Sequence, residues 1–440
     1  MKPLFALCFL VGVLGLAARA AAQTQLTLAE AIARARTQNP DAGGTAAAER
    51  EAGERVKQAR AGYLPRVDVV ESWQRGNHPV FVFSSLLAQR QFTAADFALD
   101  ALNHPGAVDN FRSTVMVEQS LFDAGTRANV TAAGIGHDMA STSRTVVDHD
   151  LAEAVTNAYG RVLVAAAASL SASAAVDTAR ADRELAGNRR DAGLVTDADV
   201  LQLDVYVSRM REQQIRAMSD ERIARAELNQ LMGEPLGEAF ALDRSPQASV
   251  IEATDLAALE AEALENRPAV KLAVLQQRLA GATEAAARAA FLPQVSAQGG
   301  WEFNGGAWNA RASSWVVGAV ARFNVFRGFS DTARLAEARE QTARRALERE
   351  KAETAARLDV HIAVARLDAA RASDAVGRAA VEQARESRRI VRDRYEAGLI
   401  DVTSLMRAAE AVMQAETQQT AAQVAVLTGT AALERTLGRR

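Results

Sequence analysis

The sequence Ala-Gly-Leu-Val at residues 192–195 returns as Ala-Gly-Leu-Ile at residues 397–400, an offset of 205 residues (398 minus 193). Other matches occur in the same order along the chain: Tyr63-Leu64-Pro65 with Phe291-Leu292-Pro293, Leu121-Phe122 with Val325-Phe326, Leu228 with Leu433, and Gly233 with Gly438. An ordered series of matches indicates an internal duplication. The sequence therefore predicts two copies of one structural unit, the first over residues 23–245 and the second over residues 246–440.

The glycines of the two matching segments predict sharp reversals of long helices. Gly193 and Gly398 accept the positive φ that such turns need, because glycine has no Cβ. Thr196 and Asp199 follow the first turn with the spacing of a capping box, in which a hydroxyl and a carboxylate satisfy free amides at the start of a helix.

The positions of the nine prolines mark where long helices can form. Proline breaks helix interiors, and residues 106–234 and 294–440 contain none. Alanine, arginine, glutamate, leucine and glutamine dominate residues 126–190 and 331–394, which predicts two helices of about 65 residues, each roughly 100 Å long if straight. An ordinary long coiled coil would also explain these helices taken alone. Downstream of Ala22 we expect no membrane-spanning helix.

Each repeat also has two segments in which apolar and polar residues alternate, as in strands with two different faces. The apolar positions are Val67, Val69, Trp73, Val115, Val117 and Leu121 in the first repeat, and Val295, Ala297, Trp301, Phe303, Trp315, Val317, Ala319, Phe323 and Val325 in the second. The predicted strand pairs cover residues 66–122 and 294–326, and strands of about ten residues cross a bilayer when tilted. Trp301, Trp308 and Trp315 lie near the predicted strand ends and suit an aromatic girdle at the membrane interface.

Four strands are too few to close a barrel, and an open sheet edge is not viable in lipid. Because a small barrel needs about eight strands, closure requires several copies of the chain, and three copies would supply about twelve. A soluble hairpin packed on helices is the alternative.

Residues 1–22 have the features of a secretory signal peptide: a positive start, an apolar run and a small-residue cleavage site before Gln23. A membrane anchor, the alternative, needs a longer apolar run. The one cysteine, Cys8, falls within this leader, so we expect the mature chain to contain no disulfide. Removal of Lys2 and Arg19 changes the formal net charge from −3 to −5, which argues against nucleic-acid binding.

The first repeat carries an extra segment between its two strands. The offset between the repeats falls from 228 residues at Pro65 to 204 at Leu121, so about 24 residues are additional. Within residues 76–110, a capping box (Thr93 with Asp96) and a hydrophobic staple (Phe92 with Phe97) predict a short helix over residues 94–102. Because it joins two predicted membrane strands, we expect it to be extracellular and packed over the barrel mouth; a disordered loop is the alternative.

Together these motifs resemble those of the TolC-like outer-membrane efflux proteins. The resemblance covers nearly the whole mature chain and rests on the order of residues 63–65, 121–125, 192–200, 291–293, 325–328 and 395–402. It implies a mixed α and β membrane protein, in which three chains form a twelve-stranded transmembrane β-barrel in the outer membrane and a long α-helical coiled-coil tunnel in the periplasm. Such a homotrimer is the exit duct of a tripartite efflux system, which passes small molecules from an inner-membrane pump and a periplasmic adaptor to the outside.

The resemblance also places the two glycine segments at the closed inner tip of the tunnel. It implies that the adaptor contacts the residues of these turns, namely Gly193, Leu194, Thr196, Gly398 and Leu399. A leucine at such a turn can instead fold back on its own helix pair, which is the alternative for Leu194 and Leu399.

The gate is where this sequence departs from the best-known members of the family. Those members carry acidic residues after the second glycine motif, whereas the aligned positions here are Ser404 and Arg407. We therefore take Asp199, Asp401 and Arg407 as candidates for charges that hold the gate closed, the alternative being that Arg407 only faces solvent.

Catalysis has little support in this sequence. The five histidines form no metal-binding pair at helical spacing, and no nucleophile motif or complete phosphate loop occurs. We expect no enzymatic activity, no cofactor and no metal. A periplasmic helical scaffold and a duct for type I protein secretion remain as alternative functions, because the pump and not the duct selects the cargo.

Overall fold

The computed structural model describes residues 25–243 and 255–439, so the predicted signal peptide at residues 1–22 lies outside the described residues. The chain divides into two compact units. Among the described residues, we call 25–43, 147–243, 255–263 and 358–439 the helical unit, and 44–146 and 264–357 the strand unit. Each sequence repeat contributes to both units.

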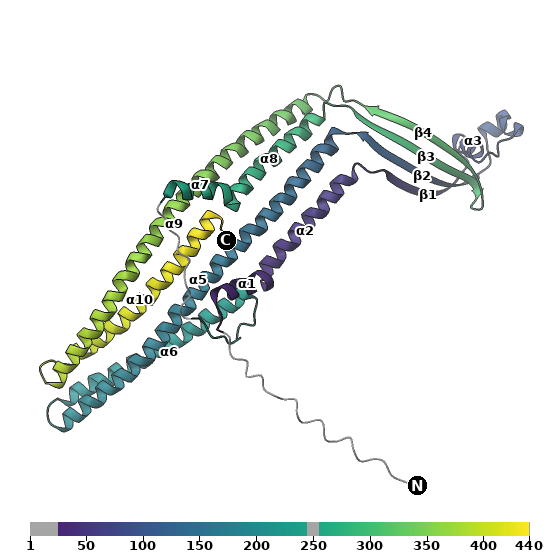
Figure 1. Ribbon diagram of the computed structural model, residues 1–440. Coiled ribbons are helices and arrows are strands. Elements are labelled where there is room, and N and C mark those ends of the chain that lie inside the picture. The colour runs from purple at the N-terminus through teal and green to yellow at the C-terminus, as the bar shows by residue number, and fades with distance from the viewer. Residues whose placement is uncertain (1–24, 244–254, 440) are drawn as a thin grey trace, which may run out of the picture. The chain divides into compact units, whose positions relative to one another are not determined.

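The helical unit is built from the long helices that the proline-free segments predict. α5 (Ala124–Asp191) and α9 (Ser330–Glu396) each contribute their C-terminal part to it, together with α1 (Leu28–Gln38), α6 (Asp197–Met232), most of α7 (Leu256–Asn266) and α10 (Val402–Leu437) (Figure 1). The bounds of α5 and α9 confirm the two predicted helices to within two residues at each end.

Equivalent helices of the two repeats form equivalent cores. In the first repeat, Leu151, Val155 and Val162 of α5 pack with Leu228 of α6. In the second repeat, Val360 and Leu367 of α9 pack with Leu433 of α10, which is the counterpart of Leu228. The duplication seen in the sequence is therefore also a duplication of packing.

By length and composition, α5 contains one 18-residue window that is apolar enough to cross a membrane, with a mean hydropathy of 1.6, contrary to the expectation from sequence. The window is apolar because α5 is rich in alanine, a residue that also lets neighbouring helices approach closely. The same helix supplies Val155, Ala158 and Val162 to the core of the helical unit, but only 28% of the window is buried within one chain, so this core accounts for part of its apolar character.

The strand unit contains one antiparallel sheet in the order β1-β2-β3-β4 (Figure 1). Its strands are β1 (Arg66–Gly76), β2 (Val108–Phe122), β3 (Gln294–Ala307) and β4 (Ala310–Arg322). The helices α2 (Pro40–Ala61) and α8 (Pro268–Ala289) precede the two strand pairs. The soluble hairpin that was the alternative would need only two paired strands, whereas all four pair in one sheet.

The second strand pair is shorter than predicted: β4 stops at Arg322, four residues before the predicted end at residue 326. The chain turns there: Gly328 and Phe329 both have positive φ, of 60° and 66°, and lead directly into α9. Asn324 donates a hydrogen bond to Asp331 at the start of α9, which ties the turn to that helix.

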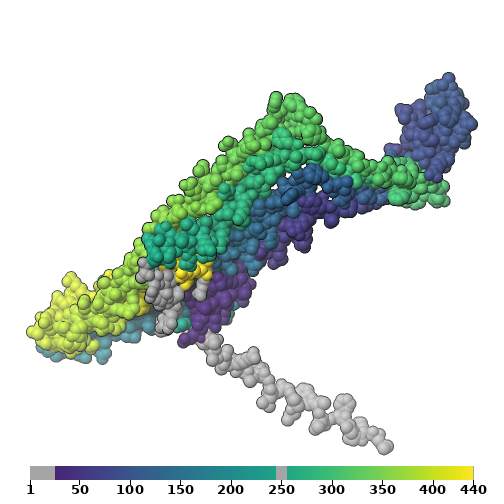
Figure 2. All heavy atoms as spheres, turned by 45° about the horizontal axis from the view of Figure 1, so that its top comes forward, coloured from purple at the N-terminus to yellow at the C-terminus, as the bar shows by residue number. Residues whose placement is uncertain are grey.

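The extra segment of the first repeat is ordered, and we call residues 77–107 the outer insert. It contains α3 (Pro79–Ala88), a single 3₁₀ turn η1 (Ala94–Phe97) and α4 (Leu99–Asn103), and it forms a separate lobe at the end of the sheet in Figure 2. The single helix predicted over residues 94–102 is wrong, because Ala98 has an extended ψ of 135° that breaks it. The predicted staple is confirmed, since the rings of Phe92 and Phe97 lie 4.9 Å apart.

Candidate functional site: two helix turns and a two-faced sheet

The two glycine segments form the same helix-ending turn. At the first, the Leu194 amide donates to the Arg189 carbonyl at 2.8 Å and the Gly193 amide to the Arg190 carbonyl at 2.8 Å. The second turn repeats this pattern at Leu399 and Gly398, with distances of 2.9 and 3.0 Å. These are Schellman motifs, which need a left-handed residue, and Gly193 and Gly398 have the predicted positive φ of 75° and 76°.

Each turn is followed by a helix whose first amides are capped by a side chain. Thr196 and Asp199 form the predicted capping box at the start of α6, with the Thr196 amide 2.9 Å from the Asp199 carboxylate. Asp401 caps α10 by accepting from the amide and the hydroxyl of Ser404, at 2.9 and 2.7 Å. These two hydrogen bonds lower the pKa of the Asp401 carboxyl below its usual range. Each cap therefore stabilises the point at which the chain leaves the turn and enters the next helix.

The leucines of the two turns are exposed. The exposed fraction is 65% for Leu194 and 73% for Leu399. In a Schellman motif this position usually packs on the residue three places before the end of the helix. Here those residues are Arg189 and Arg394, which offer no apolar partner. Within one chain, therefore, neither leucine folds back on its own helices.

An arginine joins the two turns. The Arg189 guanidinium lies 5.3 Å from the ring centroid of Tyr395 and donates to the carbonyl of Glu396, a free acceptor at the end of α9. The Tyr395 ring is buried, which raises the pKa of its hydroxyl. Sequence reasoning missed this contact. One signal was available in the sequence: the two repeats differ at this position, where the second repeat has Tyr395 and the first has Arg190 (395 minus 205).

A buried layer supports the turns. It contains apolar residues from all four helices that end or begin there: Val176, Ala179 and Ala186 of α5, Val200, Leu203, Tyr206, Val207 and Met210 of α6, Tyr395 of α9, and Val402 and Leu405 of α10. One carboxyl also lies in this region, because Asp182 is only 2% exposed. Burial raises its pKa, and Arg388 and Arg392 of α9 oppose that rise. The two turns therefore rest on a buried core formed by all four helices.

The charges proposed for a gate have separate surroundings within one chain. Asp199 and Asp401 are both engaged as helix caps. In the described part of the chain Arg407 forms no hydrogen bond or ion pair, and its charge contributes only a smaller part of the lowered pKa of Asp401. A different pair, missed from sequence, is formed at the first turn, where Arg190 contacts Asp191 at 2.7 Å and Asp197 at 3.7 Å.

The register of the sheet gives it two unlike faces. Even-numbered residues share what we call the polar face, which includes Asp68, Ser72, Gln74, Asn110, Arg112, Thr114, Glu118, Gln298, Glu302 and Asn304. Odd-numbered residues share what we call the apolar face, whose members are mostly apolar: Val67, Val69, Trp73, Phe111, Val115, Val117, Trp301, Phe303, Trp315 and Val317. The charged residues Glu71, Arg75 and Asp109 also lie on this face, and they form ion pairs there. Such alternation suits a sheet with lipid on one side and water on the other.

The tryptophans gather on the apolar face. Trp301 and Trp315 are direct cross-strand partners and are 57% and 69% exposed. They lie within β3 and β4, whereas the sequence placed them near strand ends. Trp308 lies in the turn between these strands, beneath the guanidinium of Arg311. Trp73 and Phe111, which were not selected as girdle residues, extend the group, with ring centroids 6.4 Å apart.

The two outer strands of the sheet are suited to pairing with other copies. β1 and β4 are edge strands, and β1 runs toward the outer insert while β4 runs away from it. The β4 edge of one chain can therefore pair antiparallel with the β1 edge of another, which continues the pattern inside the chain.

Nothing resembling a metal centre is found in residues 25–243 and 255–439, where no three His, Cys, Asp or Glu side chains cluster.

The chain is similar to known proteins in sequence and in fold. The family model described as outer membrane efflux protein matches residues 31–234 and 259–439. Protein CyaE of Bordetella pertussis is 29% identical over 309 residues, which cover 68% of this chain and 65% of that protein, so the match spans just under two thirds of the relative.

Two solved structures show the same fold. The outer membrane protein VceC of Vibrio cholerae has a TM-score of 0.78 at 18% identity, with 93% of this chain and 96% of that chain covered. A membrane protein of Pseudomonas aeruginosa has a TM-score of 0.79 at 20% identity, with 93% and 90% covered.

Proposed function

Because this chain belongs to the outer membrane efflux proteins, which are channels of the outer membrane and not enzymes, we propose that three copies form the exit duct of a tripartite efflux system. In this proposal the strands cross the outer membrane and the helices extend into the periplasm. Small molecules pass from an inner-membrane pump, through the interior, to the outside. The periplasmic scaffold is thereby set aside, since the family consists of transport channels.

The observation that carries the proposal is the four-stranded sheet with two free edges and two unlike faces. In hydrocarbon an unpaired strand edge costs several kcal/mol for each polar group, so the sheet is not viable there as a monomer. Three copies supply about twelve strands, which close a barrel. The polar face then lines the interior, and the apolar face with Trp301, Trp308 and Trp315 contacts lipid.

We assign the two turns to the inner end of the duct, where the adaptor docks. Leu194 and Leu399 present exposed apolar side chains at equivalent positions of the two repeats. Gly193, Gly398 and Thr196 hold the backbone that displays them. Three copies would arrange six such turns around one axis, which suits helical hairpins of an adaptor as partner.

The oligomeric state tests this function directly. We expect the protein in the outer-membrane fraction, and native mass spectrometry in detergent should give a mass of three chains. Expression in a strain that lacks its own exit duct should restore resistance when the matching pump and adaptor are present. A monomer recovered without detergent in the soluble fraction would overturn the proposal.

Arg407 provides a test of the gate. Since Arg407 has no ion-pair partner among the described residues, we propose that its partner is an acidic group of a neighbouring copy in the closed trimer. Exposed pairs contribute about 0–1 kcal/mol each, and three copies add their contributions. Replacing arginine by glutamate turns attraction into repulsion, so Arg407→Glu should raise the opening frequency of single channels in planar bilayers.

The control for this experiment is Arg211→Glu, which reverses the charge of an exposed arginine on a different helix, α6, whereas Arg407 lies on α10. It should leave the opening frequency unchanged. If Arg407→Glu also behaves as the wild type, Arg407 is a surface charge with no role in gating.

A further inference from the structure

The outer insert is fastened to the polar face of the sheet. The Gln89 amide donates to the Asp109 carbonyl at 2.8 Å and to the side chain of Asn110 at 3.0 Å. Asn110 in turn donates to Asn304 at 3.0 Å. All three amide side chains are buried, at 6%, 7% and 1% exposure. A buried chain of satisfied amides fixes geometry, so the insert is held on this face and does not swing freely.

Two further contacts widen this attachment. The Arg90 guanidinium donates to the Ser313 carbonyl of β4 at 2.8 Å, so the insert reaches across to the far strand. The ring of Phe81 covers Gly76 at the end of β1, where a Cβ would lie 3.5 Å from it. The insert therefore contacts strands at both sides of the sheet.

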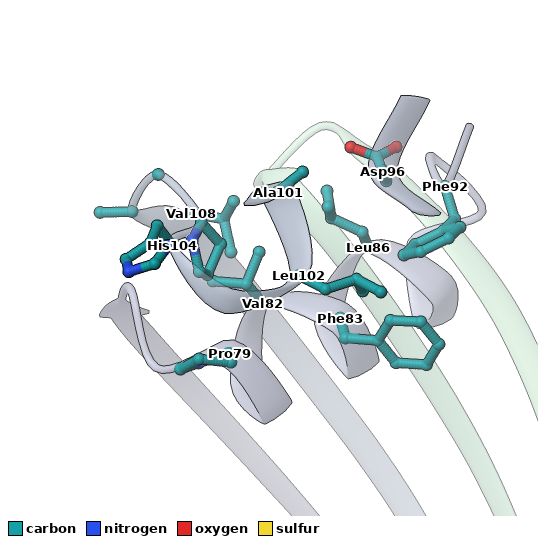
Figure 3. Close-up of a pocket in the computed structure, with 13 residues that line it drawn as sticks. Pro79, Val82, Phe83, Leu86, Phe92, Asp96, Ala101, Leu102, His104 and Val108 are labelled. Carbon is teal, nitrogen blue, oxygen red and sulfur yellow. The ribbon is translucent and has the colours of Figure 1, made fainter. Parts of the chain in front are cut away.

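The insert has a small core of its own. Phe83 and Phe92 meet edge to face at 4.7 Å, and with Val82, Leu86 and Leu102 they line a cavity of about 400 Å³ (Figure 3). This core accounts for the buried side of α3 and for the inward side of α4. It leaves four large apolar side chains of the insert largely exposed, including Phe97, whose ring packs on Phe92 at one side only.

We call these four exposed side chains the apolar surface of the insert. Its members are Val80 and Leu87 of α3, Phe97 of η1 and Leu99 of α4, with exposed fractions of 69%, 58%, 64% and 76%. Four large apolar side chains within 31 residues exceed what a solvated loop needs, and such surfaces mark contact sites.

Lipid does not suit this surface. The insert is attached to the polar face, which carries Arg112, Glu302 and Asn304 and cannot face hydrocarbon. The lipid-facing tryptophans lie on the opposite face. The apolar surface of the insert thus points into the space that the polar faces of several copies enclose. In a closed trimer, the bodies nearest to that space are the inserts of the other two copies.

We propose that the three outer inserts of a trimer pack against one another through Val80, Leu87, Phe97 and Leu99 and cover the outer mouth of the barrel. This inference rests on the trimeric duct proposed above. The partner of each insert is a second copy of this chain, and the contact is threefold symmetric. A twelve-stranded barrel is wider than the eight-stranded barrels that side chains fill, so it has room for such a cover.

Cysteine cross-linking tests the contact in the full trimer. The mature chain is expected to lack cysteine, because Cys8 lies in the predicted leader, so Leu99→Cys introduces a single thiol. Thiols related by a threefold axis should join under copper–phenanthroline or a short bismaleimide, and give a dimer band on a non-reducing gel. The matched control is Trp308→Cys, at a 63% exposed position in the turn between β3 and β4, which should stay unlinked while reacting equally with a maleimide dye.

The outcomes separate the two proposals. If native mass spectrometry gives no trimer, the duct proposal fails and the cover fails with it, because the cover needs three copies. If the trimer forms but Leu99→Cys remains unlinked with both reagents, the cover is wrong; quenching of a label at residue 99 by brominated lipid would then show that the surface faces the membrane. A second measurement is single-channel conductance: Leu99→Asp with Leu87→Asp, at two positions exposed in the single chain, should raise it severalfold if the inserts obstruct the mouth, and an unchanged conductance contradicts the proposal.

Discussion

Replacing Leu194 and Leu399 together by aspartate should abolish efflux while the yield of trimer stays normal. Both side chains are largely exposed within the chain, at 65% and 73%, so their loss removes little folding energy. At a docking surface the effect is different, because binding would bury two aspartates per chain without partners. Burying an unpaired carboxylate costs several kcal/mol, and six such groups in a trimer exceed what a periplasmic contact supplies.

The measurement is drug resistance in a strain that depends on this duct, with trimer yield followed on a native gel. Leu236→Asp is the matched control, since Leu236 is 62% exposed in the loop after α6 and is not part of either turn. It should leave resistance intact. If the double variant confers the same resistance as the wild type, the turns are not the adaptor site.

The single variants add information about symmetry. Because Leu194 and Leu399 occupy equivalent positions in the two repeats, an adaptor that docks equally on both should respond about equally to either change. A strong effect of one variant alone would indicate that the adaptor distinguishes the two turns.

Features governed by local sequence were predictable here. Proline excludes helix interiors and glycine accepts positive φ, so the absence of proline and the two glycine segments located α5, α9 and the turns between long helices. Period-two alternation located the four strands, because side chains of a strand point to opposite faces. The capping boxes at Thr93 and Thr196 were found for the same reason, since each involves residues three positions apart.

Features that depend on distant partners were not predictable. The Arg189–Tyr395 contact joins residues 206 positions apart (395 minus 189), and neither residue has a local signature. The amide chain from Gln89 to Asn304 likewise depends on how the insert folds over β2 and β3. The helix predicted over residues 94–102 is broken at Ala98, directly after Phe97, whose ring also packs on Phe83 of α3, a tertiary contact that the local pattern does not show. Such contacts select one of several locally allowed conformations, and the selection is visible only in the folded chain.

Replacing Arg189 by alanine should open the inner end of the duct. In the structure this guanidinium joins the two turns of one chain, by stacking on Tyr395 and donating to the Glu396 carbonyl. A cation–π contact contributes about 0.5–2 kcal/mol, and a hydrogen bond from a charged donor about 1.5–3 kcal/mol. If separation of the turns accompanies opening, the closed state loses about 2 kcal/mol or more per chain, and each 1.4 kcal/mol changes the equilibrium about tenfold.

The readout is the open probability of single channels in planar bilayers, which should rise at least about tenfold in Arg189→Ala. Two conservative variants identify the atoms responsible. Arg189→Lys keeps the charge but lacks the planar fork that stacks and donates at once, so it should give an intermediate value. Tyr395→Phe keeps the ring and removes a hydroxyl that has no hydrogen-bond partner among residues 25–243 and 255–439, so the channel should stay closed. If Tyr395→Phe opens the channel as much as Arg189→Ala, the hydroxyl and not the ring holds the gate, and the role assigned to Arg189 is wrong.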